Sequence, residues 1–351
     1  MICGDSRLKT ILHCDLSHER SCDIIFRGNS MASHTNVVAP DLKAIREAHQ
    51  RISNRIHRTP VFTCSSLDEI AGARIFFKCE NFQKTGSFKI RGATNAVFSL
   101  TDEEAKQGVV APSSGNHAAA LALAARWRGI PAWLVMPSNS SAAKKSAVKA
   151  YGGHITECES TVASREATTA NIIKQTGAHL VHPYNDPRVI AGQGTAALEL
   201  LDEVPDLDFI LAPVSGGGLL SGTTIAAKSI CPGVRVIGGE PSSADDAFRS
   251  LKSGKIEPAS TSETIADGLR ATLCPLTFAI LHDQVDSIAL VEEADIVSTM
   301  LLLWERAKLV VEPSGAVAAA PTLMRTIGAE GKKVGVILSG GNLDLRNLPF
   351  A

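Results

Sequence analysis

Short β-rich runs alternate with alanine-rich helical stretches along most of this chain. Stretches such as NHAAALALAARWRG and LLSGTTIAAKSI lie between the β-rich runs. Strand, helix and strand in succession are typical of parallel sheets that helices cover on both faces. An α/β fold is therefore predicted, preceded by a helix within 41–56. The predicted strands are 73–80, 108–113, 131–137, 209–214, 234–240 and 333–340.

The composition is that of an ordinary globular protein, and it excludes some partners. The formal net charge of −1 argues against nucleic acid or an anionic membrane surface as the main partner. No apolar run approaches the length of a membrane span. The eight cysteines are scattered without a CxxC motif, which fits reduced thiols better than disulfides or a zinc site. We expect a cytoplasmic protein that acts on small molecules.

The first thirty-odd residues differ from the rest of the chain. They mix basic and acidic side chains and contain no apolar core of the kind that a signal peptide needs. A transit peptide is usually poor in acidic residues, so that interpretation fits no better. We expect residues 1–35 to form a poorly ordered extension.

Three of the predicted strands end in small polar loops. These loops are SSGNH at 113–117, SGGG at 215–218 and SGGN at 339–342. In open α/β folds, ligands bind beyond the carboxyl ends of the strands. We therefore expect the three loops to line a common site.

The SGGG loop at 215–218 separates a predicted strand from a predicted helix. Glycines let backbone N–H groups approach an anion, and a helix N-terminus favours negative charge, so a phosphate fits here. A tight turn that needs glycine only for its backbone angles explains the same residues equally well. The spacing differs from GxGxxG and GxxxxGK[ST], which argues against a dinucleotide or a nucleoside triphosphate.

The SSGNH loop has the same strand, loop and helix context. Its serines, asparagine and histidine could hold an anion or the polar edge of a cofactor, and a serine hydroxyl could transfer a proton. Helix capping is the simpler explanation for serine and asparagine at this place. A hydrolase triad is unsupported because the chain lacks GxSxG.

The stretch GGEPSSADD places Glu240 at a strand end, with Asp245 and Asp246 soon after it. Carboxylates together with a loop carbonyl suit a hard cation such as Mg²⁺ or Ca²⁺. From the spacing alone, the aspartates more simply cap and charge the first turn of the following helix.

Lys89 lies between Phe88 and Ile90 in KTGSFKIRGA, residues 84–93. A desolvated lysine has a lowered pKa and readily forms Schiff bases. Most lysines are exposed, so this stretch alone favours a surface residue. A lysine of this kind, a phosphate loop and an α/β scaffold together indicate pyridoxal phosphate, which needs all of these features. The combination favours Lys89 as a catalytic residue.

Several motifs in the same order resemble the serine racemase and serine/threonine dehydratase family. They are KTGSFKIRGA, SSGNHAAALA, IAGQGTAALEL, SGGGLLSG, EPSSADDA and ILSGGNLDL, and the resemblance runs from about residue 37 to the C-terminus. It implies a fold type II pyridoxal phosphate enzyme, tryptophan synthase β-like, with two open twisted mostly parallel sheets flanked by helices. It also implies a homodimer. We expect a small mobile domain at 108–185 and a large cofactor-binding domain made of 36–107 and 186–351.

The resemblance implies a role for each residue of the cofactor site. Lys89 forms the Schiff base, and Ser339 donates to the pyridine nitrogen. A serine at that nitrogen favours elimination or reprotonation at Cα over transamination. The other residues that the resemblance assigns to the cofactor are Phe88 beside the ring, Asn116 at the ring hydroxyl, and Ser215, Gly216, Gly217, Gly218 and Leu219 at the phosphate.

The resemblance also implies the substrate contacts and the mechanism. Lys89 removes the α-proton as general base, and Ser114 delivers a proton on the opposite face for racemisation. In dehydration the β-hydroxyl leaves instead, and the products are pyruvate and ammonia. The substrate carboxylate is held by Ser113, Ser114, Asn116 and His117.

Two further sites follow from the resemblance. Glu240, Asp246 and the carbonyl of Ala244 become ligands of a divalent cation, Mg²⁺, Ca²⁺ or Mn²⁺. ATP is an activator in some members, and the matching positions are Tyr151, Lys308 and Asn342. The animal enzymes carry glutamine where this chain has Ala119 and asparagine where it has Tyr184. Both differences favour the plant or fungal branch, and the first counts against activation by ATP.

Three functions stay open at this point. The first is a serine racemase that interconverts L- and D-serine and also has serine dehydratase activity. The second is a catabolic L-threonine/L-serine dehydratase without a racemase role, which would use the same lysine and loops. The third is a non-catalytic relative that binds pyridoxal phosphate. The lysine, the phosphate loop and the partner of the ring nitrogen are all present, which disfavours the third.

Overall fold

The computed structural model describes residues 38–259, 263–346 and 348–349, and residues from Ala39 onward form one compact unit. The prediction for residues 1–35 therefore lies outside the described residues. Within the described part, the strands form two sheets. None of the helices described is long and apolar enough to cross a membrane.

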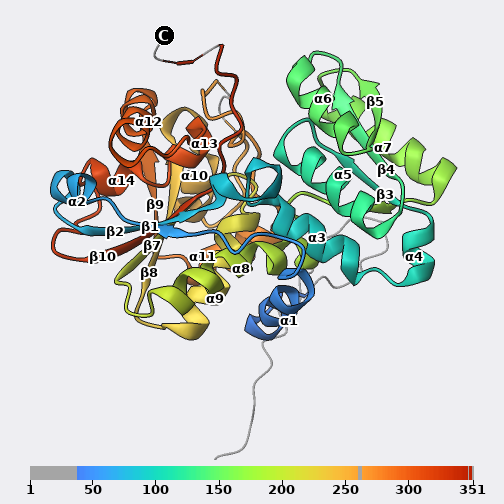
Figure 1. The fold of residues 1–351 in the computed structure, drawn as a ribbon. Coiled ribbons are helices and arrows are strands. Elements are labelled where there is room, and N and C mark those ends of the chain that lie inside the picture. Colours follow the sequence, from blue (N-terminus) through green and yellow to red (C-terminus); the bar gives the residue numbers. More distant parts are fainter. Residues whose placement is uncertain (1–37, 260–262, 347, 350–351) are drawn as a thin grey trace, which may run out of the picture. The chain divides into compact units, whose positions relative to one another are not determined.

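The larger sheet has six strands in the order β1-β2-β10-β7-β8-β9 (Figure 1). Neighbouring strands are parallel, except that β1 runs antiparallel to β2. β10 and β7 are direct neighbours, so the loops that follow them start from the same edge of the sheet. The strands are β1 (Val61–Phe62), β2 (Arg74–Cys79), β7 (Phe209–Pro213), β8 (Arg235–Pro241), β9 (Ser287–Val291) and β10 (Lys333–Leu338).

The smaller sheet has four parallel strands in the order β5-β4-β3-β6. They are β3 (Val109–Pro112), β4 (Ala132–Pro137), β5 (His154–Cys158) and β6 (His179–Leu180). The α/β fold and all six predicted strands are confirmed, whereas β1, β5, β6 and β9 were not predicted. β1 and β6 have only two residues each, and β5 is a polar, partly exposed edge strand. The division into two domains stays a prediction.

Helices separate most of the strands in sequence. The longer ones are α1 (Leu42–Ile52), α3 (Lys89–Ser99), α5 (Asn116–Arg128), α6 (Ala142–Ala150), α7 (Val162–Thr176), α8 (Pro187–Glu203), α9 (Gly218–Ile230), α10 (Asp246–Ser253), α11 (Pro275–Gln284) and α12 (Glu293–Ala307). The shorter ones are α2 (Ser65–Ala71), α4 (Asp102–Lys106), α13 (Pro313–Ala316) and α14 (Ala320–Leu323), with 3₁₀ turns at Glu80–Phe82, Lys84–Gly86 and Ser242–Ala244.

Both faces of the larger sheet are covered by helices (Figure 1). Along β7, Ile210 and Ala212 belong to the apolar cluster of α8, α9 and α11. The alternate residues Phe209 and Leu211 belong to the cluster of α12 and α14. Alternate side chains of a strand point to opposite faces, so burial on both faces explains why the strand is a continuous apolar run.

Helix α3 connects the larger part of the fold to the smaller sheet. It packs against α8 on one side and α5 on the other. Its residues Ile90, Ala93 and Val97 are fully buried in the cluster that also contains Val109 and Leu134 of the smaller sheet. Because α3 begins at Lys89, this packing fixes where the backbone of that lysine lies.

Candidate active site

Lys89 is the first residue of α3, and its side chain is partly buried. Nζ donates a hydrogen bond to the carbonyl of Pro183 at 3.2 Å and lies 5.0 Å from the centre of the Phe88 ring. Among the described residues, no carboxylate pairs with this amine. Desolvation lowers the pKa of Lys89 to about 8. More of it is therefore the free amine at neutral pH than for an exposed lysine.

The backbone before Lys89 is tied to the end of strand β10. The Phe88 N–H donates to the carbonyl of Ser339 at 3.0 Å, and Ser87 forms an isolated β-bridge with Gly340. Ser339 is nearly fully buried. The predicted Schiff-base lysine and the predicted partner of the ring nitrogen therefore lie on segments that bond directly to each other.

The predicted phosphate loop follows the neighbouring strand β7. Ser215 Oγ donates to the carbonyl of Ala271 at 3.1 Å and accepts from the Ala271 N–H at 2.9 Å. Gly217 has a φ of 85°, in the left-handed region, and α9 starts at Gly218 with Leu219 buried behind it. The loop thus presents the N-terminus of a long helix, where an anion is favoured.

The SSGNH loop meets the SGGN loop through side chains. Asn342 Nδ2 donates to Asn116 Oδ1 at 3.0 Å, and Asn116 Nδ2 donates to Glu312 Oε1 at 2.9 Å. The Asn342 N–H donates to Glu312 Oε2 at 3.0 Å. Asn116 is the first residue of α5, so these bonds place the start of α5, with half-buried Ser113 and Ser114 before it, against the loop after β10.

Glu312 was not predicted as a site residue. It lies just before α13 and is 4% exposed, and burial raises its pKa to about 8. It is therefore predominantly a neutral acid at pH 7, which suits a side chain whose hydrogen-bond partners among the described residues are Asn116 and Asn342. In the sequence, Glu312 is simply an acid between VV and PSG. Its partners Asn116 and Asn342 are distant in the sequence, so these contacts could not be predicted.

Two histidines lie near Lys89, and only His117 was predicted. His117 Nε2 donates to the carbonyl of Val181 at 2.9 Å, and His182 Nδ1 accepts from the backbone N–H of Asn185 at 2.9 Å. Burial, followed by the charge of Lys89, lowers the pKa of His117 to about 3 and that of His182 to about 4. Both rings are neutral at physiological pH, so neither adds positive charge beside the amine.

The predicted cation ligands are adjacent, but one of them already caps a helix. Glu240, in strand β8, accepts from the N–H groups of Ala247 and Phe248 at 2.8 Å each. Asp246 is 2% exposed, and its Oδ2 has no hydrogen-bond partner among the described residues. Burial raises the pKa of Glu240 to about 8 and that of Asp246 to about 6. The Arg249 charge opposes the rise at Asp246, and no group of three or more His, Cys, Asp or Glu side chains among the described residues could hold a metal ion, so the cation site stays a prediction that rests on two carboxylates and the carbonyl of buried Ala244.

The positions matched to a nucleotide site are not joined to each other. Tyr151 ends α6 and packs against the core of the smaller sheet. Lys308 follows α12 with a φ of 60°, and its Nζ donates to the carbonyl of Glu305 at 2.7 Å. In the described part of the chain, Asn342 is the member of this set that contacts the SSGNH loop. The nucleotide site stays a prediction.

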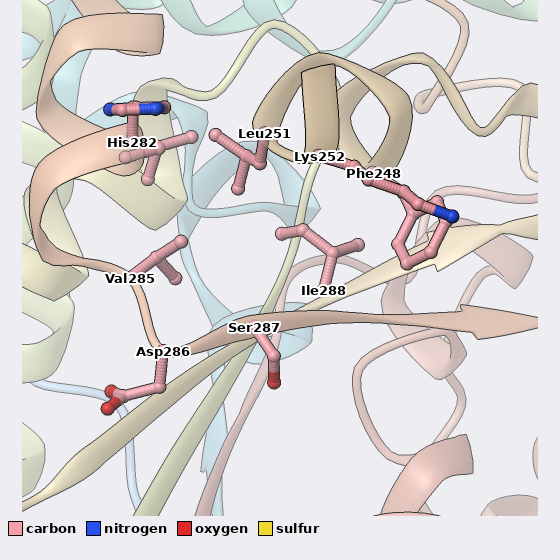
Figure 2. Close-up of a pocket in the computed structure, with 9 residues that line it drawn as sticks. Phe248, Leu251, Lys252, His282, Val285, Asp286, Ser287 and Ile288 are labelled. Carbon is pink, nitrogen blue, oxygen red and sulfur yellow. The ribbon is translucent and has the colours of Figure 1, made fainter. Parts of the chain in front are cut away.

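Figure 2 shows an open cavity of about 310 Å³ elsewhere on the chain. Residues of α10, α11 and β9 line it, among them Phe248, His282 and Ile288. It contains none of the side chains predicted for catalysis or for the cofactor. The candidate active site is therefore identified from the contacts among its loops.

The residues present fit pyridoxal phosphate. Lys89 supplies an amine that pairs with no carboxylate in the described part of the chain, and the loop at 215–218 supplies a glycine-rich helix N-terminus. A Cβ added at Gly216 would lie 2.4 Å from the Tyr184 ring, so the loop has no room for a side chain there. Ser339 offers a hydroxyl on the segment that bonds to Phe88.

Comparisons with known proteins agree with this site. A family described as "Pyridoxal-phosphate dependent enzyme" matches residues 52–340. The serine racemase of Oryza sativa subsp. indica is 49% identical over 323 residues, which cover 91% of this chain and 95% of that protein. The β-hydroxyaspartate dehydratase of Paracoccus denitrificans (strain Pd 1222) is 50% identical over 311 residues, which cover 89% of this chain and 99% of that protein.

A solved structure described as maize serine racemase has the same fold. It superposes with a TM-score of 0.86 at 48% sequence identity, over 88% of this chain and 95% of that chain. The predicted fold type II architecture, with two mostly parallel sheets flanked by helices, is confirmed. This chain belongs to the pyridoxal-phosphate-dependent enzymes, in the group that contains the serine racemases and their dehydratase relatives.

Proposed function

We propose that this chain is a serine racemase that interconverts L- and D-serine and also converts serine to pyruvate and ammonia. The observation that carries this proposal is the place of Lys89. Its amine is desolvated and pairs with no carboxylate of the residues that the structure describes, and its backbone is tied to the loop after β10. The high identity to serine racemases supports the same function.

Lys89 would act as the base on one face of the substrate. When bound, pyridoxal phosphate stabilises the negative charge that develops at Cα of the amino acid. With a pKa of about 8, Lys89 can accept the α-proton and return it near neutral pH. His117 and His182 are neutral at this pH, so neither adds a positive charge that would compete with the amine.

Ser114 would deliver a proton on the opposite face of Cα. It lies two residues before Asn116, whose side chain bonds to Asn342 and Glu312, so the loop is held beside the end of β10. Backbone N–H groups at the start of α5 favour an anion, which supports a carboxylate contact with Ser113, Ser114, Asn116 and His117. In elimination, the same loop would hold the substrate while the β-hydroxyl leaves.

The decisive experiment measures both products in the same tubes. Cofactor-loaded protein is incubated with L-serine and Mg²⁺, D-serine is quantified by chiral chromatography, and pyruvate is quantified in parallel. We expect wild-type protein to form both products, and Ser114→Ala to lose D-serine formation while it still forms pyruvate. Pyruvate without D-serine from wild-type protein would identify a dehydratase without a racemase role.

The substrate range needs its own assay. A relative 50% identical to this chain is named a β-hydroxyaspartate dehydratase, so β-hydroxyaspartate is a specific second candidate substrate. We would compare kcat/KM for L-serine, L-threonine and β-hydroxyaspartate under identical conditions. A higher kcat/KM for β-hydroxyaspartate would make elimination from that substrate the main activity.

A divalent cation and a second subunit complete the proposed enzyme. Glu240, Asp246 and the Ala244 carbonyl would hold Mg²⁺, Ca²⁺ or Mn²⁺, since both carboxylates are buried and Asp246 Oδ2 has no partner among the described residues. We expect Mg²⁺ to raise the Tm of wild-type protein but not that of Asp246→Asn.

The chain would act as a homodimer, which light scattering can test. Activation by ATP would be measured in the same serine assay.

A further inference from the structure

We propose that Tyr184 is a positioning residue for the phosphate end of the cofactor, because its ring packs onto Gly216 and holds the loop at 215–218 in shape. This proposal rests on the proposed function only in assuming that the chain binds pyridoxal phosphate. It gives a physical reason for one of the three glycines of the loop. It also assigns a role to a residue that differs from the animal enzymes.

The contact between Tyr184 and Gly216 is close. A Cβ added at Gly216 would lie 2.4 Å from Cδ1 and Cε1 of Tyr184 and 2.5 Å from Cγ. Real Cβ atoms essentially never come this near to a ring, so the ring lies directly against the Gly216 backbone. Gly216 is not among the glycines with positive φ. Space against the ring therefore requires glycine here, whereas backbone conformation does not.

The two neighbouring glycines are required for different reasons. Gly217 has a φ of 85°, which disfavours any side chain, and a Cβ there would lie 2.8 Å from Leu273 and Thr277. A Cβ at Gly218 would lie 2.9 Å from Cβ and 3.2 Å from Cα of Tyr184. Truncating the Tyr184 ring would thus make room at Gly216 and at neither of the other two positions.

A well-bonded turn holds Tyr184 in place. His182 Nδ1 accepts from the backbone N–H groups of Tyr184 and Asn185, and the His182 ring packs edge-on against the Tyr184 ring with centres 4.6 Å apart. Asp186 caps α8 and forms an ion pair with Arg188 at 2.8 Å. These bonds limit how far the ring can move away from the loop.

The same turn also reaches the other end of the proposed cofactor site. Pro183, the residue before Tyr184, provides the carbonyl that accepts from Lys89 Nζ at 3.2 Å. One short segment therefore contacts the amine that bonds the cofactor and the loop that holds its phosphate. Removing the ring should loosen the phosphate end and leave the amine end unchanged.

The first test compares two ligands that differ in the phosphate group. Cofactor-stripped protein is titrated with pyridoxal phosphate and with pyridoxal, and binding is followed by the visible absorption of the ligand. We expect Tyr184→Ala to weaken pyridoxal phosphate by about tenfold and pyridoxal by less than about twofold. Tyr184→Phe should bind both ligands like wild-type protein. Equal weakening of the two ligands by Tyr184→Ala would overturn the proposal.

The second test is a double-mutant cycle on the contact itself. Gly216→Ala should weaken pyridoxal phosphate strongly in the wild-type background, since the new Cβ collides with the ring. In the Tyr184→Ala background the same change should have little effect. Gly217→Ala is the matched control, because Tyr184→Ala cannot relieve its positive φ. Additive effects of Gly216→Ala and Tyr184→Ala would overturn the proposal.

The controls separate this proposal from the proposed function. Wild-type protein that binds no pyridoxal phosphate would refute the function, whereas binding with an additive cycle would refute only the role of Tyr184. Thermal unfolding of each cofactor-stripped variant shows whether it folds. Tyr184→Ser replaces Tyr184→Ala in the same cycle if the alanine variant does not fold, since serine also removes the aromatic ring and has only one heavy atom beyond Cβ, which can turn away from Gly216.

Discussion

Lys78 is fully buried and Lys89 partly buried, and the surroundings of their amines differ. Lys78, in β2, is fully buried, and its Nζ donates to Glu199 Oε2 at 2.8 Å and to the carbonyl of Thr59 at 2.6 Å. Lys89, at the start of α3, donates to the carbonyl of Pro183 and has no carboxylate partner among the described residues. One amine is half of an ion pair, and the other is not.

The ion pair of Lys78 belongs to a balanced network of two bases and two acids. Arg91 lies at its centre and uses all five of its N–H donors, toward Glu80, Glu199 and Thr195. Thr59 Oγ1 donates to Glu80 Oε1 at 2.5 Å. The network connects β2, α3 and α8 without solvent, so each charge in it has a partner.

This difference makes Lys89, and not Lys78, the amine that we expect to react. Desolvation lowers the pKa of both amines, but for Lys78 the charge of Glu199 acts in the opposite direction. For Lys89 nothing opposes desolvation, and the pKa falls to about 8. Burial alone therefore does not identify a reactive lysine. Desolvation without a carboxylate partner makes Lys89 the stronger candidate, because its charged form then has little to stabilise it.

Removal of the Lys89 amine should give the largest effect on activity. Lys89→Met removes both the nucleophile and the base, so we expect turnover of L-serine to fall by a factor of about 10⁴. The stability of the cofactor-free protein should not fall, since the substitution breaks no ion pair. Turnover assays and chemical unfolding of the same preparations check both statements. Marked destabilisation by Lys89→Met would remove the contrast with Lys78.

Removal of the Lys78 amine should have the opposite profile. Lys78→Met leaves Glu199 with one cationic partner fewer in a buried site, which we expect to cost about 3 kcal/mol of stability. Turnover per folded molecule should stay near that of wild-type protein, because Lys78 is outside the proposed site. The double variant Lys78→Met/Glu199→Gln is the matched control and should recover part of the loss. Loss of turnover in well-folded Lys78→Met would contradict the comparison.

The contrast between the two lysines was only partly visible in the sequence. Lys89 could be chosen as a candidate because a local motif, glycine loops and a family resemblance all indicated the same chemistry, and its role stays a prediction. Lys78 could not, because in RIFFKCE a lysine in a strand gives no sign that Glu199 of a distant helix lies beside it. His182 and Glu312 were missed for the same reason: their contacts with residues distant in the chain exist only after folding.

In the fold, too, features that depend on local sequence could be predicted, whereas contacts between distant segments could not. The core strands could be predicted because burial on both faces gives continuous apolar runs, as in β7 and β10. The edge strands β5 and β9 are partly exposed, so their sequences lack this signal. The glycine loop was predicted, but the contact between Gly216 and Tyr184 depends on packing between separate segments.

The contribution of Lys89 to the pH dependence of stability should be a smaller effect than the two substitutions above. Between pH 8 and 10.5 native Lys89 has largely lost its proton, while the unfolded chain still binds one. Stability of the cofactor-free protein should therefore rise with pH in this window, by at most about 3 kcal/mol. Lys89→Met should show a smaller rise when both proteins are unfolded with urea across the range. Identical slopes for the two proteins would mean that Lys89 has an ordinary pKa.

Removal of the Asp41 helix cap, which contacts neither Lys78 nor Lys89, should have the smallest effect. It serves as a control for the predictions on the two lysines. Asp41 Oδ1 accepts from the Ala44 N–H at 2.8 Å at the exposed start of α1, a helix that packs against α8. Asp41→Ala should cost about 1 kcal/mol because it removes this cap. It touches neither lysine, so the pH dependence between 8 and 10.5 and the turnover of L-serine should both be unchanged. A change in either would mean that general loosening around α8 reaches the site, and the separate effects expected for Lys78 and Lys89 would then need another explanation.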